Sequence, residues 1–158
     1  MLFNSEKGSI VVQGKMLLES AQLLVQLERY ALAAPIFEEM GQKYCENNLL
    51  RYSAKDQFLN AGLCRLATGD VSNTSRKLDD YRMADVSFED SRQFKLLSAC
   101  LTAFEEGKPD DFATAVAEFD SMTKLEAFRT QLLLAAKKLI QSGAADDLLM
   151  GDDDFDLT

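Results

Sequence analysis

The sequence predicts an all-α fold built from antiparallel helical hairpins. Apolar residues recur every three or four positions through most of the 158 residues, whereas the alternation typical of a β-strand is nearly absent. The chain holds only two prolines and eight glycines, and the glycines fall mostly between the periodic segments. Short connections make consecutive helices antiparallel. The length suits one domain with a sizeable core, predicted here over residues 1–142.

The first two predicted helices cover residues 9–28 and 31–47. The pattern Arg29-Tyr30-x-x-Ala33-x-x-x-Phe37 matches the second helix of a tetratricopeptide repeat (TPR), in which a small residue lets two helices approach and an aromatic ring fills the gap. Pro35 is tolerable only because it lies near the start of its helix. We therefore expect a TPR-like hairpin over residues 9–50. Hairpins of this kind stack into a right-handed α-solenoid.

The remaining predicted helices cover 52–67, 71–83, 90–106, 110–121 and 124–142. Gly69-Asp70 should end one helix and cap the next, and Gly107 should end another, with Asp110 capping its successor. The spacing from Thr123 to Glu126 predicts a capping box. Residues 51–142 are therefore predicted to close the solenoid with a small C-terminal helical bundle.

The last sixteen residues, 143–158, contain six Asp and neither Lys nor Arg. These six account for most of the net charge of −9, leaving −3 for the residues before them. A run of one sign cannot compact without repelling itself, so an acidic disordered tail is expected. Two interpretations stay open, which are binding to a basic partner and simple solubilisation.

Composition excludes several classes of function. A pI near 4.5 argues against nucleic-acid binding. The absence of His removes the commonest general base and zinc ligand, and no phosphate-binding glycine loop occurs, so we expect no catalysis, cofactor or metal. Adjacent carboxylates such as Glu38-Glu39 are interpreted as solvated faces. The three widely spaced cysteines, the lack of a signal-peptide core and the lack of a long apolar run predict a soluble cytoplasmic interaction module.

Several segments together resemble a known family. They are, in order, Leu49-Leu50-Arg51-Tyr52-Ser53-Ala54-Lys55-Asp56, then Phe88-Glu89-Asp90-Ser91-Arg92, Phe104-Glu105-Glu106 and Glu118-Phe119-Asp120-Ser121-Met122. With residues 15–30, they resemble the C-terminal half of the soluble NSF attachment proteins (SNAPs) of the alpha/beta type. The resemblance covers residues 10–142, and Asp156-Leu157 is similar to the acidic, Leu-tipped ending of that family.

The resemblance implies an adaptor. Such proteins lie along four-helix SNARE complexes (syntaxin-like partners) with a basic face and present an acidic C-terminal end to the hexameric AAA ATPase NSF, which disassembles SNARE complexes in vesicle fusion. Carried over by position, the SNARE-facing residues are Lys15, Lys55 and Arg92, although each could be an ordinary solvated cation. The implied NSF-facing residues are Glu105, Glu106, Asp156 and Leu157, with Asp70 substituting for an acidic family position that falls on Gly69.

The chain also departs from the family pattern. An acidic position one turn before Glu105 is Thr102. The N-terminal half of the family, including an apolar loop that touches membranes, has no counterpart, so we expect weaker SNARE binding and only indirect, peripheral membrane contact. Two alternatives remain, which are a regulatory or dominant-negative fragment that occupies NSF and a generic TPR-like scaffold for an unrelated peptide.

Overall fold

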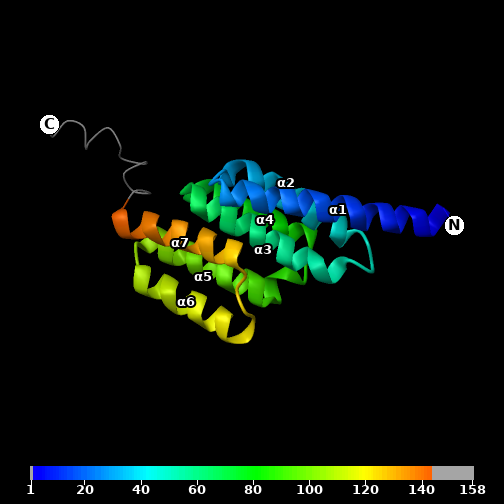
Figure 1. Ribbon diagram of the computed structural model, residues 1–158. Coiled ribbons are helices and arrows are strands. Elements are labelled where there is room, and N and C mark those ends of the chain that lie inside the picture. Colours follow the sequence, from blue (N-terminus) through cyan, green and yellow to red (C-terminus); the bar gives the residue numbers. More distant parts are fainter. Residues whose placement is uncertain (1, 144–158) are drawn as a thin grey trace.

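A computed structural model describes residues 2–143, with side chains from residue 11 onward. Over that range the chain forms seven α-helices and one short 3₁₀ helix, and no strand (Figure 1). The elements are α1 (Leu2–Gln26), α2 (Tyr30–Cys45), α3 (Arg51–Thr68), α4 (Val71–Ala84), η1 (Phe88–Asp90), α5 (Arg92–Glu106), α6 (Pro109–Met122) and α7 (Ala127–Ser142). The predicted all-α fold of helical hairpins is confirmed. Except for Gly143, the predicted disordered tail lies outside the described residues.

Most of the predicted helix ends are correct. Gly69 and Gly107 both adopt left-handed backbone conformations, with φ of 84° and 66°, and end α3 and α5. The Asp70 carboxylate caps α4 by accepting a hydrogen bond from the Asn73 N–H at 3.0 Å. A left-handed residue without a Cβ at the end of a helix, followed by a short acidic cap, is a strong local signal, which explains why these breaks could be predicted.

Three predicted helix starts are wrong. Helix α1 begins at Leu2, because Gly8 does not interrupt it. Helix α6 begins at Pro109, whose fixed φ suits the first helical position, so Asp110 lies inside the first turn and does not cap it. The expected capping box is absent, because the Asp120 carboxylate accepts the Leu125 N–H at 3.1 Å and α7 begins only at Ala127.

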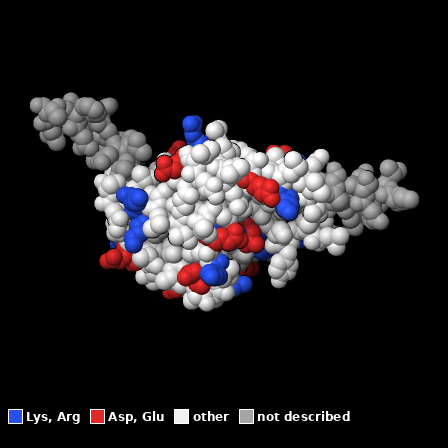
Figure 2. Space-filling model, viewed as in Figure 1, with Lys and Arg blue, Asp and Glu red and all other residues white. Residues whose placement is uncertain are grey.

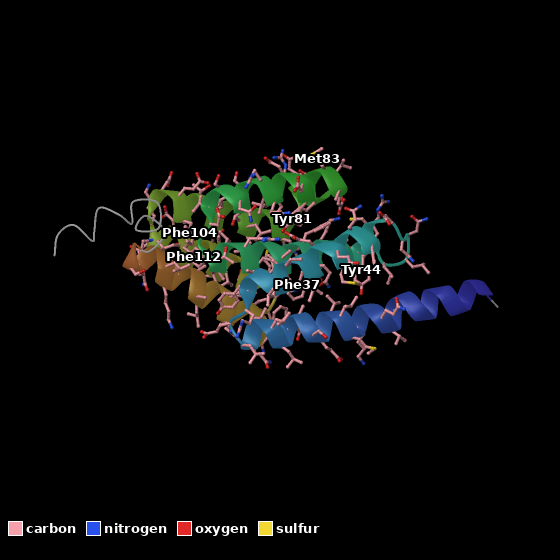
Figure 3. The ribbon with its side chains drawn as sticks, turned by 90° about the horizontal axis from the view of Figure 1, so that it is seen from above. Phe37, Tyr44, Tyr81, Met83, Phe104 and Phe112 are labelled. Atoms are coloured by element: carbon pink, nitrogen blue, oxygen red, sulfur yellow. The ribbon has the colours of Figure 1, made fainter. Side chains whose placement is uncertain are left out.

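Helix α3 lies at the centre of the packing. It contacts α2, α4, α5 and α7, while α1 covers the other side of α2 and α6 closes against α5 and α7 (Figure 1). Ala33 and Phe37, the two residues of the repeat-like pattern, are fully buried in α2. Phe37 points into the interior between the helices (Figure 3). The roles expected for the small residue and the aromatic ring are therefore consistent with the structure.

Two glycines permit close contacts between α3 and its neighbours. A Cβ on Gly41 of α2 would lie 2.5 Å from the Phe58 ring, and a Cβ on Gly62 of α3 would lie 2.6 Å from a Leu97 methyl carbon. Phe58 stacks on Tyr81 with ring centroids 4.9 Å apart, and Leu97 is fully buried, so neither side chain has room to move. These glycines set the distance between α2 and α3 and between α3 and α5.

Replacing Gly62 with alanine should therefore destabilise the protein although alanine is the better helix former. We expect the free energy of unfolding to fall by roughly 1–2 kcal/mol, because overpacking a closed core outweighs the gain in helix propensity. Urea denaturation followed by circular dichroism measures the change. Ala117, on the exposed side of α6, offers the converse control, since Ala117→Gly should cost only about 1 kcal/mol of helix propensity. A stabilised Gly62→Ala protein would contradict the packing.

The outer side of α1 carries several exposed apolar side chains beside Glu19. Val12, Met16, Leu23 and Leu27 follow one helical stripe and are 58%, 64%, 58% and 67% exposed. The N-terminal turns of α1 project beyond the other helices (Figure 1). No described helix is both long and apolar enough to cross a membrane.

Candidate protein-interaction surfaces

The helix directions place the predicted site residues at two ends of the molecule. Gln93, in the first turn of α5, donates a hydrogen bond from Nε2 to Asp56 of α3 at 3.1 Å, and Gly62 faces Leu97 further along both helices. Helices α3 and α5 are therefore parallel. They begin together at what we call the Lys55 end and stop together at the Glu105 end, separated by the 18 residues of α3, which span about 27 Å.

Lys55 is part of a clamp at the Lys55 end. Its Nζ donates hydrogen bonds to Asp85 Oδ2 at 2.8 Å and to Ser87 Oγ at 2.7 Å. Asp85 Oδ1 accepts two more from Ser87, from N at 3.0 Å and from Oγ at 2.6 Å. The Lys55 side chain is only 23% exposed and that of Asp85 only 5%. The charge of Lys55 is thus paired within the chain, and the clamp holds the loop between α4 and η1 against α3.

The clamp also shifts the pKa values of Asp85 and of the nearby Cys45. Burial alone would raise the pKa of Asp85, but the hydrogen bonds from Lys55 and Ser87 outweigh burial and hold it below its usual value. The pKa of the Cys45 thiol is raised by burial and then by the Asp85 carboxylate. Cys45 closes α2, so the last turn of that helix also lies near the clamp.

Arg92 and Lys15 are the exposed predicted cations. Arg92 opens α5 and donates a hydrogen bond from Nη1 to Thr123 Oγ1 at 3.0 Å, which ties the start of α5 to the end of α6. Lys15 follows Gly14, which packs on Tyr44 near the end of α2. Among the described side chains, Lys15 has no ion-pair partner. All three predicted cations therefore lie toward the same end of the molecule.

Apolar side chains at the Lys55 end were missed from the sequence. Leu49 and Tyr52 flank the start of α3, and Met83 and Val86 flank the clamped loop; they are 70%, 93%, 81% and 86% exposed. Helical periodicity could have identified Tyr52 as exposed, because it does not lie on the buried face of α3 that includes Ala54 and Phe58. Met83 lies in the last turn of α4, whereas Val86 is a loop residue and carries no such signal, because only the clamp brings the loop beside α3.

The Glu105 end carries carboxylates. Glu105 and Glu106 are exposed in the last turn of α5, and Glu106 forms a surface ion pair with Lys108 at 3.3 Å. Asp70 is also exposed, although one of its oxygens caps α4. Helix α7 runs antiparallel to α6 and ends at this end, where Gly143 is the last described residue. Asp156 and Leu157 lie outside the described residues.

Comparisons with known proteins relate this chain to one family. A family model described as soluble NSF attachment protein, SNAP, matches residues 1–141. The alpha-soluble NSF attachment protein of Vitis vinifera is 43% identical over 122 residues, which are 77% of this chain and 42% of that protein. The beta-soluble NSF attachment protein of Bos taurus is 41% identical over 133 residues, 84% of this chain and 44% of that protein.

A fungal protein is also similar to this chain. The probable vesicular-fusion protein sec17 homolog of Schizosaccharomyces pombe is 37% identical over 134 residues, which are 85% of this chain and 46% of that protein. The chain thus spans about half the length of the relatives it matches.

Proposed function

The chain belongs to the soluble NSF attachment protein family, and on that premise we propose that it is a half-length adaptor between SNARE complexes and the ATPase NSF. One observation carries the proposal, which is that cations with exposed apolar side chains and a pair of exposed carboxylates lie at opposite ends of α3 and α5. A rigid body with two chemically different ends can hold two partners at once. The adaptor would work in the cytoplasm, associate with membranes only through SNARE complexes, and catalyse nothing itself.

The Lys55 end would face the SNARE bundle. Arg92 and Lys15 can pair with surface carboxylates of a four-helix bundle, while Tyr52 and Leu49 add apolar area that bare charge attraction lacks. Because Asp85 already neutralises Lys55, Lys55 would serve mainly by holding the 85–87 loop in place. Each contact is weak, so several must act together.

The Glu105 end would face NSF. Glu105 and Glu106 are exposed to a basic partner, which would compete with Lys108 for Glu106. Asp70 is also exposed, although one of its oxygens caps α4. Residues 144–158 follow Gly143 from this same end and carry six further Asp together with Leu157. Charge would govern the approach, and Leu157 would supply a small desolvated anchor.

The half-length span keeps two other functions open. A fragment that holds NSF but grips SNAREs poorly would inhibit disassembly by full-length adaptors, and a scaffold for an unrelated peptide would bind neither partner. A disassembly assay with SNARE complex, NSF and ATP distinguishes them. Stimulation supports the adaptor, suppression of the full-length protein supports the fragment, and absence of NSF binding even at low salt supports the scaffold.

Two variants should distinguish the functions of the Lys55 end and the C-terminal segment. Arg92→Glu should weaken SNARE binding about tenfold with only a small loss of stability, because the exposed hydrogen bond to Thr123 is lost but an acid is favourable in the first turn of a helix. Arg76→Glu on α4 makes the same charge change away from the Lys55 end and should have little effect. Leu157→Ala should leave SNARE binding intact and reduce stimulation of the ATPase. Binding assays and ATPase rates measured on the same preparations decide the matter, and unchanged stimulation by Leu157→Ala would count against the proposal.

A further inference from the structure

An apolar groove whose use is unexplained lies between α6 and α7. It encloses about 510 Å³, and its floor is formed by Phe112, Val116 and Leu133. Leu134 at its edge is 53% exposed. Figure 2, viewed as in Figure 1, shows Lys and Arg side chains near the end of the molecule where α7 stops. Nothing in the adaptor function proposed above uses the groove.

Charged side chains lie at both ends of the groove. Lys137 lies near one end, close to where α7 stops, and Lys124 lies at the other end, in the connection between α6 and α7. The apolar stretch of Val116, Leu133 and Leu134 lies between them. Asp120 is the acidic side chain in the lining, and its carboxylate is partly satisfied by the Leu125 N–H. The groove therefore presents a basic end at Lys137, an apolar middle, and a second end where Lys124 lies near Asp120.

The segment that follows Gly143 has the complementary order. Asp146-Asp147 comes first, then Leu148-Leu149-Met150, and then Asp152-Asp153-Asp154. We propose that residues 146–154 of this chain occupy the α6–α7 groove, with the first acidic pair at Lys137, the apolar triplet over Leu133 and Leu134, and the second acidic run at Lys124. Both the charge and the order of apolar and acidic groups match this occupant.

The lengths also match. Along α7, Leu133 lies ten residues before Gly143, about 15 Å at the helical rise. An extended segment of five residues, from Ala144 to Leu148, spans about 16 Å. Gly143 has φ of 68°, the left-handed conformation that commonly ends a helix and turns the chain away from its axis. The segment can therefore retrace α7 and bring each group to its partner.

Docking in this direction has a regulatory consequence, which rests on the proposed function. It would carry Asp156 and Leu157 past Lys124, toward the Lys55 end and away from Glu105 and Glu106. The groove and the ATPase would then compete for the same segment. The C-terminal segment would be held back until NSF, or another basic partner, draws it out.

Paramagnetic relaxation in the full-length protein tests the docking without either partner. A nitroxide is attached to Gly151→Cys in a Cys45→Ser background; Cys64 and Cys100 should stay unlabelled, because burial raises the pKa of both thiols to about 12. We expect the methyl signals of Val116, Leu133 and Leu134 to lose several-fold more intensity than those of Val71 and Leu78 on α4. High salt should reduce the difference.

Matched variants complete the experiment. Lys124→Glu/Lys137→Glu should abolish the selective loss, whereas Arg76→Glu/Lys77→Glu on α4 changes the net charge equally and should preserve it. Should the groove variant fail to fold, Asp152→Asn/Asp153→Asn/Asp154→Asn releases the segment without altering the body. Uniform broadening, no broadening, or broadening only between differently labelled molecules would overturn the proposal. Neither partner is present in these measurements, so a failure of docking would leave the proposed SNARE and NSF binding standing.

Discussion

Replacing Glu38 with alanine should lower the free energy of unfolding by roughly 3 kcal/mol or more. Glu38 in α2 accepts hydrogen bonds from Arg65 of α3, from Nε at 3.1 Å and from Nη2 at 2.7 Å, and from the hydroxyl of Tyr81 in α4. The side chains of Glu38 and Arg65 are only 17% and 14% exposed. Removing the carboxylate therefore leaves a guanidinium and a phenol that water reaches poorly, in the middle of three helices.

The adjacent residue provides the control. Glu39 forms an i,i+4 ion pair with Lys43 at 3.1 Å, but its side chain is 60% exposed. Glu39→Ala should change stability by less than about 0.5 kcal/mol, since exposed pairs contribute little. Urea denaturation of both variants gives the comparison. Equal stability losses for Glu38→Ala and Glu39→Ala would show that Glu38 does not join the three helices.

Glu38 and Glu39 show what helical periodicity alone does not predict. Both carboxylates were interpreted as a solvated face, which holds for Glu39 and is wrong for Glu38. Helical spacing identifies which residues face inward, but it does not reveal that Arg65 and Tyr81, 27 and 43 residues away, converge on one carboxylate. Such a network depends on tertiary packing. The helix ends at Gly69 and Gly107 were predictable because their signals are local.

In the candidate site, too, some features could be predicted from the sequence and others depend on tertiary packing. The family resemblance implies that Lys55 and Arg92 share one basic surface, and in the structure both lie at the same end of α3 and α5. The sequence did not predict that Asp85, 30 residues from Lys55, pairs with that cation, or that Met83 in the last turn of α4 and Val86 in the following loop are exposed. Loop residues show no periodicity, so their neighbours become known only once the helices are packed.

Asp85→Asn should lower the free energy of unfolding by roughly 2–3 kcal/mol at pH 7, because charge-assisted hydrogen bonds to a buried carboxylate are lost while its shape is kept. Lys55 then keeps only Ser87 as a partner, and the 85–87 loop loosens. If Lys55 acts in SNARE binding mainly through this clamp, as proposed, Asp85→Asn should weaken SNARE binding as Lys55→Met does. Undiminished binding by Asp85→Asn would instead assign Lys55 a direct contact.

The pH dependence of the stability of Asp85→Asn separates the contribution of the Asp85 charge from that of its packing. Because the pKa of Asp85 is held below its usual value in the folded protein, its carboxylate contributes stability above the pKa of the unfolded state, near 3.9, and loses it as pH falls through the folded pKa. The stability difference between the unaltered protein and Asp85→Asn should therefore be constant from pH 7 to about pH 5 and shrink below about pH 4. Asp90→Asn, an exposed neighbour in η1, should show no comparable difference at pH 7. A difference that persisted unchanged at pH 3 would mean that packing of the side chain, and not its charge, holds the clamp together.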